Sequence, residues 1–385
     1  MLVAWGTVPA LVTAQESPAP ARFTEVRSYL EQAVERGAFP GAVLAVGLRG
    51  QVVYRTAVGA YGEGDRRPVS DTTIYDLASL TKVVGLTTAT MLLVADGQLD
   101  LDAPVRHYLP AFEGVGKDQV TVRHLLLHAS GLPAWRPLYQ EAADAPAARA
   151  LADTTPLEAP AGTRYTYSDL GAIVLTQIVE HLSGRRLDSL LAEQLFTPLG
   201  MSHTRFLPPP DWLLLIAPTE RDPWRGRVLR GEVHDENAAR LGGVSGHAGL
   251  FSTAPDLARF AFWLLNAYHD RLPPGIGPRL PAPIVRMFVR RANEPAGSTR
   301  ALGWDTFSRE GGSGGHCLSA TSFGHTGFTG TSIWIDPERD LVIILLTNRV
   351  HPTRENQLIR EVRPAVADRV VRAIAGAAAC PLLER

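Results

Sequence analysis

The chain has 385 residues, 45% of them hydrophobic and 20% charged, and a formal net charge of -1 at pH 7. This composition is typical of a globular protein, and the length allows one large or two intertwined domains with an ample core. The near-zero charge provides no basic field for nucleic acid, and no apolar run reaches the roughly 18–20 residues that span a bilayer.

The N-terminal segment differs from the rest of the chain. Residues 1–14 are apolar, and Val12-Thr13-Ala14 supplies the small residues that a signal peptidase recognises, although no basic residue precedes them. We therefore expect residues 1–20 to be signal-like or disordered, and the protein to be exported to the periplasm or secreted, with an uncleaved anchor as an alternative. The two cysteines, Cys317 and Cys380, could pair in an oxidising compartment, but the sequence does not require it.

The N-terminal part of the chain predicts a helix, a hairpin and a second helix. Apolar residues at helical spacing indicate a helix over 23–37, and alternating segments 42–48 and 52–58 indicate a hairpin around Arg49-Gly50. A short strand near 73–77 then leads to a helix over 79–95. That helix is almost wholly apolar, so we expect it to be buried on all sides.

The remainder of the chain predicts a helical middle followed by strands. Helices are expected at 122–128, 170–182, 187–195, 256–267 and 283–291, strands at 303–307, 332–335 and 341–346, and a final helix at 361–375. Strands at both chain ends predict one domain over 21–385. Its sheet would come from about 21–80 and 300–380, and an inserted helical subdomain from about 81–299.

Lysine is rare in this chain, and one of the two lysines follows a serine at Ser-x-x-Lys spacing. The two are Lys82 and Lys117, and every other fixed positive side chain is arginine. Arginine does not lose its proton, whereas a buried lysine can act as a base. We therefore predict that Ser79 is a nucleophile and Lys82 its partner. The alternative is an N-cap serine with a lysine that extends to the surface.

A second candidate element is Tyr167-Ser168-Asp169, on a loop that leads into a helix. Ser168 or Asp169 could simply cap that helix. Tyr167 is a candidate proton carrier, because a neighbouring buried cation draws a tyrosine toward the phenolate.

The third element is His325-Thr326-Gly327, in which glycine lets a ligand or backbone approach closely beside a strand. The alternative is a simple turn into the strand around Trp334.

These three elements, in this order, resemble the serine β-lactamase and penicillin-binding protein superfamily. The resemblance is to its branch around class C β-lactamases, DD-carboxypeptidases, D-aminopeptidases and related esterases, and segments 122–133, 196–201 and 246–254 are similar as well. The resemblance implies an α/β (α+β) fold with an antiparallel sheet from both chain ends, flanked by helices. It also implies catalytic roles for Ser79, Lys82 and Tyr167, and substrate contacts from Asp169, His325, Thr326, Gly327 and Phe328. The N–H groups of Ser79 and Phe328 would form the oxyanion hole, and no cofactor or metal is implied.

Two residues depart from the family pattern. His325 stands where lysine is usual, and with a reference pKa of about 6.5 it is mostly neutral at pH 7. Asp169 stands where asparagine is usual, which removes an amide donor and places an anion beside Lys82. Both changes make efficient β-lactam hydrolysis less expected.

The function that follows is acyl transfer through an ester on Ser79, with Lys82 or Tyr167 as the base. The expected substrates are D-amino-acid peptides or β-lactam-like amides of the cell envelope, that is, small molecules or peptidoglycan-derived peptides. The alternatives are a carboxylesterase of the same family and a non-hydrolytic penicillin-binding sensor. The oligomeric state is left open.

Three other patterns imitate functional motifs. Residues 311–315 match Gly-x-Ser-x-Gly, but no apolar strand precedes them and no helix follows. His124 and His128 have the spacing of zinc ligands, but no glutamate follows His124. His234-Asp235-Glu236 has ligand-type side chains, for which we expect structural hydrogen bonds instead.

Overall fold

The computed structural model describes residues 21–380, so the segment expected to be signal-like at 1–20 lies outside the described residues. The helices are α1 Thr24–Glu35, α2 Thr88–Ala95, α3 Val105–Tyr108, α4 Val122–Leu126, α5 Leu138–Glu141, α6 Ala145–Thr154, α7 Asp169–Ser183, α8 Leu187–Leu191, α9 Glu236–Arg240, α10 Ala254–Tyr268, α11 Ala282–Val289 and α12 Ile359–Ala375. The strands are β1 Gly41–Leu48, β2 Gln51–Gly62, β3 Asp65–Pro68, β4 Tyr75–Asp76, β5 Arg221–Asp222, β6 Arg227–Val228, β7 Phe251–Ser252, β8 Asp305–Thr306, β9 Phe323–Thr326, β10 Ser332–Asp336 and β11 Leu341–Thr347.

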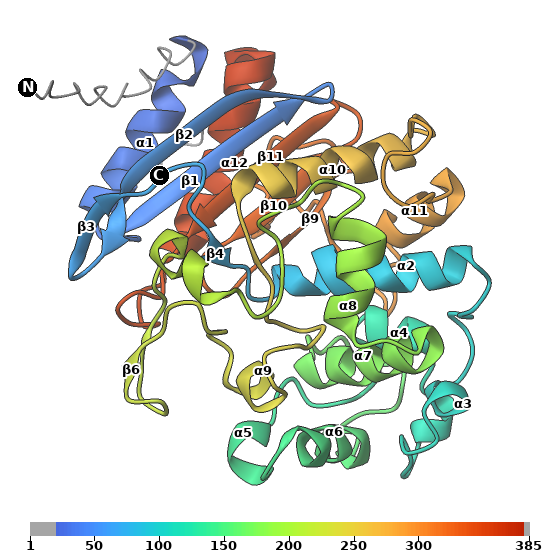
Figure 1. The fold of residues 1–385 in the computed structure, drawn as a ribbon. Coiled ribbons are helices and arrows are strands. Elements are labelled where there is room, and N and C mark those ends of the chain that lie inside the picture. The colour runs from blue at the N-terminus through green and yellow to red at the C-terminus, as the bar shows by residue number, and fades with distance from the viewer. Residues whose placement is uncertain (1–20, 381–385) are drawn as a thin grey trace, which may run out of the picture.

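One seven-stranded antiparallel sheet joins the two ends of the chain. Its order is β3-β2-β1-β11-β10-β9-β8, so N-terminal β1 lies beside C-terminal β11, with Ala42 opposite Thr347 and Leu48 opposite Leu341. The predicted hairpin is present as β1 and β2. The predicted fold class, an antiparallel sheet from both chain ends flanked by helices, is confirmed (Figure 1).

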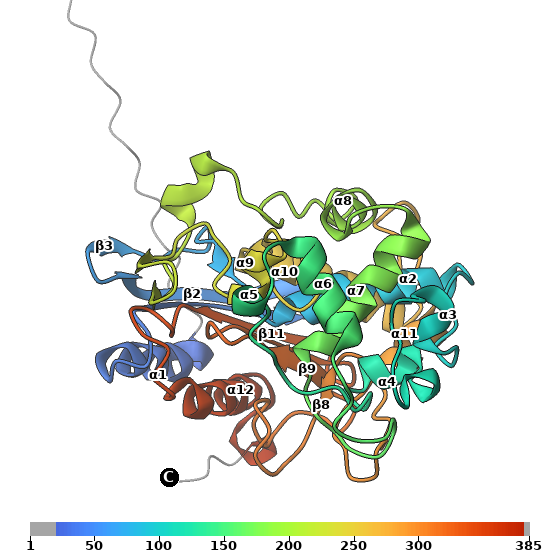
Figure 2. The same cartoon turned by 90° about the horizontal axis from the view of Figure 1, so that it is seen from below.

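The sheet is covered on both faces, which explains its continuous apolar strands. Along β1, Leu44 and Val46 pack with α1 and α12, whereas Val43 and Ala45 pack with the larger helical layer. Successive side chains of a strand point to opposite faces, so one apolar strand serves both cores. Figure 2 shows α1 and α12 together on one side of the sheet and α10 on the other.

The strand expected near 73–77 is shorter than predicted and lies outside the large sheet. β4 covers only Tyr75–Asp76 and pairs with β7. The Asp76 carboxylate accepts hydrogen bonds from the N–H groups of Ala78 (2.8 Å) and His234 (2.7 Å). The local bond from Ala78 bends the chain into a turn after the strand, and the bond from His234 ties this turn to a distant segment.

The helix expected over 79–95 is buried, as predicted, but it is not uniform. Helical structure begins after Ser79, is π-helical over Lys82–Thr87, and continues as α2. The hydroxyl of Thr88 donates to the carbonyl of Val83 at 2.9 Å, five residues back, at this change of helix type. π-helical turns inside longer helices occur frequently at functional sites.

The C-terminal strands also differ in extent from the prediction. The strand expected over 303–307 is reduced to β8, and β9 was not predicted as a strand, so His325 lies within a strand and not in a simple turn. Helix α6 was missed because its apolar residues are mostly small alanines; Asp144 caps it by accepting from Ala147 N–H at 2.9 Å.

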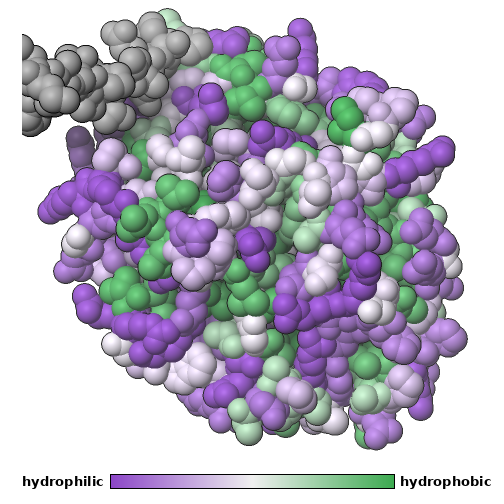
Figure 3. All heavy atoms as spheres, in the orientation of Figure 1, coloured by the Kyte–Doolittle hydropathy of each residue, from purple (hydrophilic) through white to green (hydrophobic). Residues whose placement is uncertain are grey.

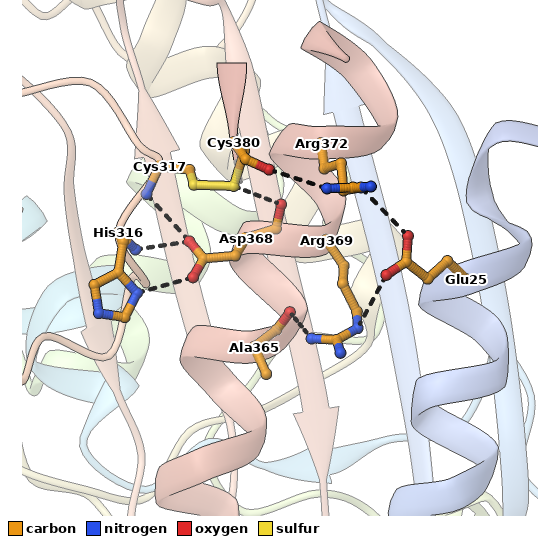
Figure 4. The surroundings of a disulfide bond; sticks show 8 residues. All are labelled: Glu25, His316, Cys317, Ala365, Asp368, Arg369, Arg372 and Cys380. Atoms are coloured by element: carbon orange, nitrogen blue, oxygen red, sulfur yellow. Dashed lines mark hydrogen bonds and ion pairs between the residues drawn. A yellow bond between two sulfur atoms is a disulfide. The ribbon is translucent and has the colours of Figure 1, made fainter. Parts of the chain in front are cut away.

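The two cysteines form a disulfide bond, which the sequence had left open. Cys317 and Cys380 have Cα atoms 5.4 Å apart and are separated by 63 positions. Figure 4 shows Asp368 of α12 beside this bond, accepting from the N–H groups of His316 and Cys317. Among residues 21–380, no helix has both the length and the apolar character to cross a membrane.

Candidate active site

Three segments that are distant in sequence line one cleft of about 440 Å³. Ser79, Tyr167 and His325 each come from a different segment and all face this cleft, and Lys82 lies behind Ser79. A larger hollow of about 520 Å³ near Trp212 contains none of the predicted site residues. The smaller cleft is therefore the candidate site, because the predicted site residues line it.

Ser79 follows a sharp turn that exposes it at the start of a buried helix. Ala78 has φ +46°, a left-handed conformation that is uncommon for a residue with a side chain, and the Asp76 carboxylate holds its N–H. The N–H of Lys82 donates to the Ser79 carbonyl at 3.0 Å, which begins the helical turn. The Ser79 side chain and the Lys82 side chain therefore lie on one face.

Lys82 is buried among oxygen acceptors. Only 3% of the residue is exposed, and Nζ lies 3.1 Å from Ser79 Oγ, 3.0 Å from the His247 carbonyl and 2.6 Å from Asp169 Oδ1. Burial by itself lowers the pKa of Lys82, but the charge of Asp169, with help from Tyr167, outweighs burial and raises that pKa above its ordinary value. Lys82 is therefore an ammonium group at neutral pH.

Tyr167 faces Lys82 from the loop before α7. Lys82 Nζ lies 5.0 Å from the centre of its ring, and the rings of His128 and His325 lie 4.5 Å and 5.9 Å from it. The neighbouring Ser168 fixes this loop, because its N–H donates to His128 Nδ1 at 3.1 Å.

Either Ser168 or Asp169 could have capped helix α7, and the structure shows which of them does. Ser168 is the cap, since its Oγ accepts from the N–H of Gly171 at 3.2 Å and donates to the carbonyl of Pro133 at 2.7 Å. Asp169 is the first helical residue, and its carboxylate points to Lys82. The first turn of α7 thereby holds this carboxylate beside the lysine.

His325 is a neutral hydrogen-bond acceptor in the wall of the cleft. It is 3% exposed, and its Nδ1–H donates to the carbonyl of Thr326 at 2.8 Å. Burial, reinforced by the charges of Arg300 and Lys82, lowers the pKa of His325 well below its ordinary value. Its Nε2 has no partner among residues 21–380. His325 therefore does not replace the fixed charge of a lysine in the family motif.

The third motif is bound directly to the nucleophile turn. Thr329 Oγ1 donates to the Asp76 carbonyl at 2.7 Å, and Thr331 Oγ1 donates to the Leu77 carbonyl at 2.9 Å. A Cβ at Gly327 would overlap the Leu77 carbonyl and the Thr331 hydroxyl, so only glycine fits there.

Two backbone donors near the nucleophile have no internal acceptor. In the part of the chain that the structure describes, neither the N–H of Ser79 nor the N–H of Phe328 donates a hydrogen bond. Unpaired N–H groups at the start of a helix and on a glycine-rich turn are the kind of donors that stabilise an oxyanion.

Sequence reasoning missed several residues around this cluster. His128, considered only as a zinc ligand, is buried and supports the Tyr167 loop; burial lowers its pKa well below the ordinary value. Arg300, which was not singled out, lies 5.2 Å from the Tyr167 ring and donates to the Tyr165 hydroxyl at 3.0 Å. No local motif marks Arg300, because it lies in a loop between α11 and β8.

The His234-Asp235-Glu236 segment makes structural hydrogen bonds, as predicted. His234 Nε2 lies 2.9 Å from Glu220, and Asp235 Oδ1 lies 2.8 Å from Nε2 of His247, whose carbonyl contacts Lys82. In residues 21–380, Cys317, Asp368 and Cys380 bring three ligand-type side chains within 4.8 Å of one another, but both sulfurs belong to the disulfide.

The class of protein that this fold and cleft define is the β-lactamase family. Residues 26–367 match the family model described as Beta-lactamase, so the chain belongs to the β-lactamase and penicillin-binding protein superfamily and is a hydrolase of that family.

Two curated relatives are similar over most of the chain. A protein of Escherichia coli K12 with the provisional name D-alanyl-D-alanine carboxypeptidase is 34% identical over 377 residues, covering 86% of this chain and 83% of its own. The N-acetylmuramyl-L-alanine amidase of Bacillus subtilis 168 is 35% identical over 368 residues, covering 84% of this chain and 80% of its own.

A solved structure extends the likeness to the fold. A penicillin-binding protein homologue from Caulobacter crescentus superimposes with a TM-score of 0.72 at 21% identity, covering 93% of this chain and 99% of its own. The expected family membership is confirmed.

Proposed function

We propose that this protein is a serine hydrolase that forms an acyl-enzyme on Ser79 and acts on cell-envelope peptides ending in D-amino acids. The observation that carries the proposal is the contact of Ser79 Oγ with buried Lys82 Nζ, 3.1 Å apart, in a cleft that also contains Tyr167 and His325. The contact places the serine hydroxyl beside a buried positive charge, which favours the negative charge that develops on the oxygen as it attacks.

The electrostatics favour Tyr167 over Lys82 as the base. A lysine held as ammonium by Asp169 cannot accept the Ser79 proton, which leaves Tyr167, whose ring centre lies 5.0 Å from Nζ, as the remaining candidate base in the cleft. In this mechanism Tyr167 removes the Ser79 proton and then protonates the leaving group. The N–H groups of Ser79 and Phe328 stabilise the tetrahedral oxyanion, and water then hydrolyses the ester.

The positive charge in the cleft supports a substrate that ends in a carboxylate. Arg300 lines the cleft beside Tyr165, and its Nη1 is buried without a partner among residues 21–380. A guanidinium binds a carboxylate through paired hydrogen bonds. The names of the two curated relatives point to cell-wall peptides as well.

The same observations support a location in the cell envelope. The disulfide between Cys317 and Cys380 fits an oxidising compartment, and the curated relatives are cell-wall enzymes by name. We therefore propose that the protein is exported to the periplasm or secreted.

One observation favours an esterase as the second candidate. Neutral His325 lacks the fixed charge that the family's lysine directs at a substrate carboxylate. At this position, therefore, the cleft favours a substrate with a carboxylate over a neutral acyl ester less strongly than a lysine would. The same substitution argues against efficient β-lactam hydrolysis.

Labelling with a fluorophosphonate probe, followed by peptide mapping, tests the nucleophile directly. We expect the label on Ser79 and none in the Ser79→Ala variant, whereas a label elsewhere would overturn the proposal.

Assays with a D-Ala-D-Ala peptide and a p-nitrophenyl ester then separate the peptidase from the esterase. Penicillin that remains bound to Ser79 without turnover, detected by mass spectrometry, would indicate a sensor instead.

A further inference from the structure

The ammonium group of Lys82 has three oxygen acceptors, and one of them is a backbone carbonyl on an irregular loop. The acceptors are Ser79 Oγ at 3.1 Å, Asp169 Oδ1 at 2.6 Å and the carbonyl of His247 at 3.0 Å. An ammonium group has three N–H donors, so these contacts use all of them. A displacement of the His247 carbonyl would therefore change the position of the lysine beside the nucleophile.

The loop that carries this carbonyl has no helix or strand to hold it. Residues 241–250 connect α9 to β7. Just before His247, the N–H of Gly246 donates to Thr176 Oγ1 at 2.9 Å. The side chain of His247 supplies two further attachments for the same loop.

The His247 ring is bound at both of its nitrogens. Nε2 donates to Asp235 Oδ1 at 2.8 Å, and Nδ1 lies 2.7 Å from Ser245 Oγ. Asp235 is itself fixed, because it caps α9 by accepting from the N–H of Ala238 at 2.7 Å. A helix cap thus holds the imidazole, and the imidazole holds the loop whose carbonyl contacts Lys82.

These side chains include the residue types of a Ser-His-Asp triad, but their burial and order exclude a second nucleophile. Ser245 is 2% exposed and His247 is 1% exposed, so a substrate does not reach the hydroxyl. In hydrolase triads the serine binds Nε2 and the acid binds Nδ1, and here the two are exchanged. The cluster therefore acts on the backbone of His247 and not on a substrate.

The carboxylate of Asp235 remains charged in this environment. Burial alone would raise the pKa of Asp235, but the charge of His247, the hydrogen bonds to the carboxylate and the charge of Lys82 lower that pKa below its ordinary value. The anion therefore keeps its hydrogen bond to the imidazole at neutral pH.

We propose that Asp235 and His247 are positioning residues for Lys82, because together they fix the backbone carbonyl that accepts the third hydrogen bond of its ammonium group. Both act through the lysine, since neither belongs to the part of the described chain that lines the cleft. The inference rests on the proposed function in one respect, namely that the ammonium group assists attack by Ser79.

Two substitutions at the same helix cap separate positioning from capping. Asparagine and serine both cap helices well, so Asp235→Asn and Asp235→Ser should keep α9. Asparagine also keeps an oxygen within reach of the imidazole, whereas the serine side chain is too short. We expect fluorophosphonate labelling of Ser79 to stay within about threefold of the wild-type rate in Asp235→Asn and to slow about tenfold or more in Asp235→Ser. Equal rates in the two variants would overturn the positioning role.

A double-mutant cycle shows whether the effect passes through Lys82. His247→Leu should slow the labelling about tenfold in the wild type but less than about twofold in Lys82→Met, because the lysine that it positions is then absent. A tenfold loss in both backgrounds would mean that His247 acts by another route. Asp256→Asn, which changes a buried carboxylate in the first turn of α10, is the matched control and should keep the wild-type rate.

The chain has two lysines, which allows a measurement that does not depend on activity. Isotope labelling at lysine Cε gives one NMR signal each for Lys82 and Lys117, and Lys82→Arg identifies the first signal by its loss. We expect His247→Leu and Asp235→Ser to move the Lys82 signal and to leave the Lys117 signal in place. If Ser79 is not labelled in the wild type, the proposed function is wrong, but a moved Lys82 signal still supports the positioning. An unmoved Lys82 signal overturns the positioning whatever the activity.

Discussion

At the scale of single residues, one substitution changes the chemistry of the whole cluster. Where the family pattern has asparagine, Asp169 places a carboxylate oxygen 2.6 Å from Lys82 Nζ, and the lysine pKa is raised despite burial. Lys82 therefore stays protonated through the neutral range and contributes charge. In the proposed mechanism, proton transfer then falls to Tyr167, whose ring centre lies 5.0 Å from Nζ.

Replacing Asp169 by asparagine tests this assignment through the pH profile. Without the carboxylate, burial dominates and the pKa of Lys82 falls. If catalysis needs the ammonium form, the alkaline limb of kcat/KM should move to lower pH by about 1 unit or more. Increased activity at neutral pH in Asp169→Asn would instead identify neutral Lys82 as the base. Asp102→Asn, which disrupts an ion pair with Arg123 away from the cleft, is the matched control.

Changing Lys82 itself separates charge from basicity. Lys82→Arg keeps the positive charge but cannot accept a proton, so we expect it to lose less than about a hundredfold in kcat/KM, whereas losing a general base costs about 10²–10⁴-fold. Lys82→Met removes the charge at similar length and should lose much more. If the two variants are equally inactive, although folded by circular dichroism, Lys82 is the base.

At the scale of elements, the disulfide joins the two parts of the C-terminal region that shape the cleft wall. Cys317 lies in the loop that leads into β9 with His325, and Cys380 follows α12, which carries Arg360 and Arg363. Asp368 of α12 adds hydrogen bonds to the same loop (Figure 4). The bond thus restrains the position of α12 relative to β9.

Removing the disulfide should destabilise the protein more than it changes the chemistry of Ser79. The cross-link is between residues 63 positions apart. For a loop of that size, chain entropy predicts a loss of about 4 kcal/mol of unfolding free energy. Chemical denaturation of Cys317→Ser/Cys380→Ser should show this loss, as should the native chain in reductant. An unchanged denaturation midpoint would contradict the structural role, and the rate of fluorophosphonate labelling at low temperature serves as the control for the site.

At the scale of the whole molecule, sequence patterns predicted what depends on local periodicity. The hairpin of β1 and β2, helices α7 and α10, and the C-terminal helix followed from apolar spacing, and the family motifs named six of the residues that line the cleft. Arg300 was not predicted, because its importance depends on which distant residues surround it. The length of β4 was also misjudged, since its last residue, Asp76, accepts one local hydrogen bond from Ala78 and one tertiary hydrogen bond from His234.

The face drawn in Figure 3 shows mostly polar side chains with apolar side chains in separate patches. Inside the protein, by contrast, two buried histidines lie near two positively charged side chains. Burial of His128 and His325, next to Arg300 and Lys82, keeps both imidazoles neutral. This arrangement has a cost that depends on pH.

The free energy of unfolding should therefore fall below pH 6.5. In the unfolded chain both histidines bind a proton at a pKa of about 6.5, whereas in the folded protein their pKa values lie well below that. Their stabilising contribution is thus complete above pH 6.5 and is lost as the pH falls toward the folded pKa values, at up to about 1.4 kcal/mol per pH unit for each histidine. Denaturation at several pH values should give a shallower slope for His325→Gln than for the wild type. His107→Gln, at an exposed position of α3, should leave the slope unchanged. The variant and the wild type share all carboxylates, so the difference between their slopes measures the contribution of the buried imidazole of His325. Equal slopes would mean that His325 is protonated in the folded protein and that the cleft is wetter than its packing indicates.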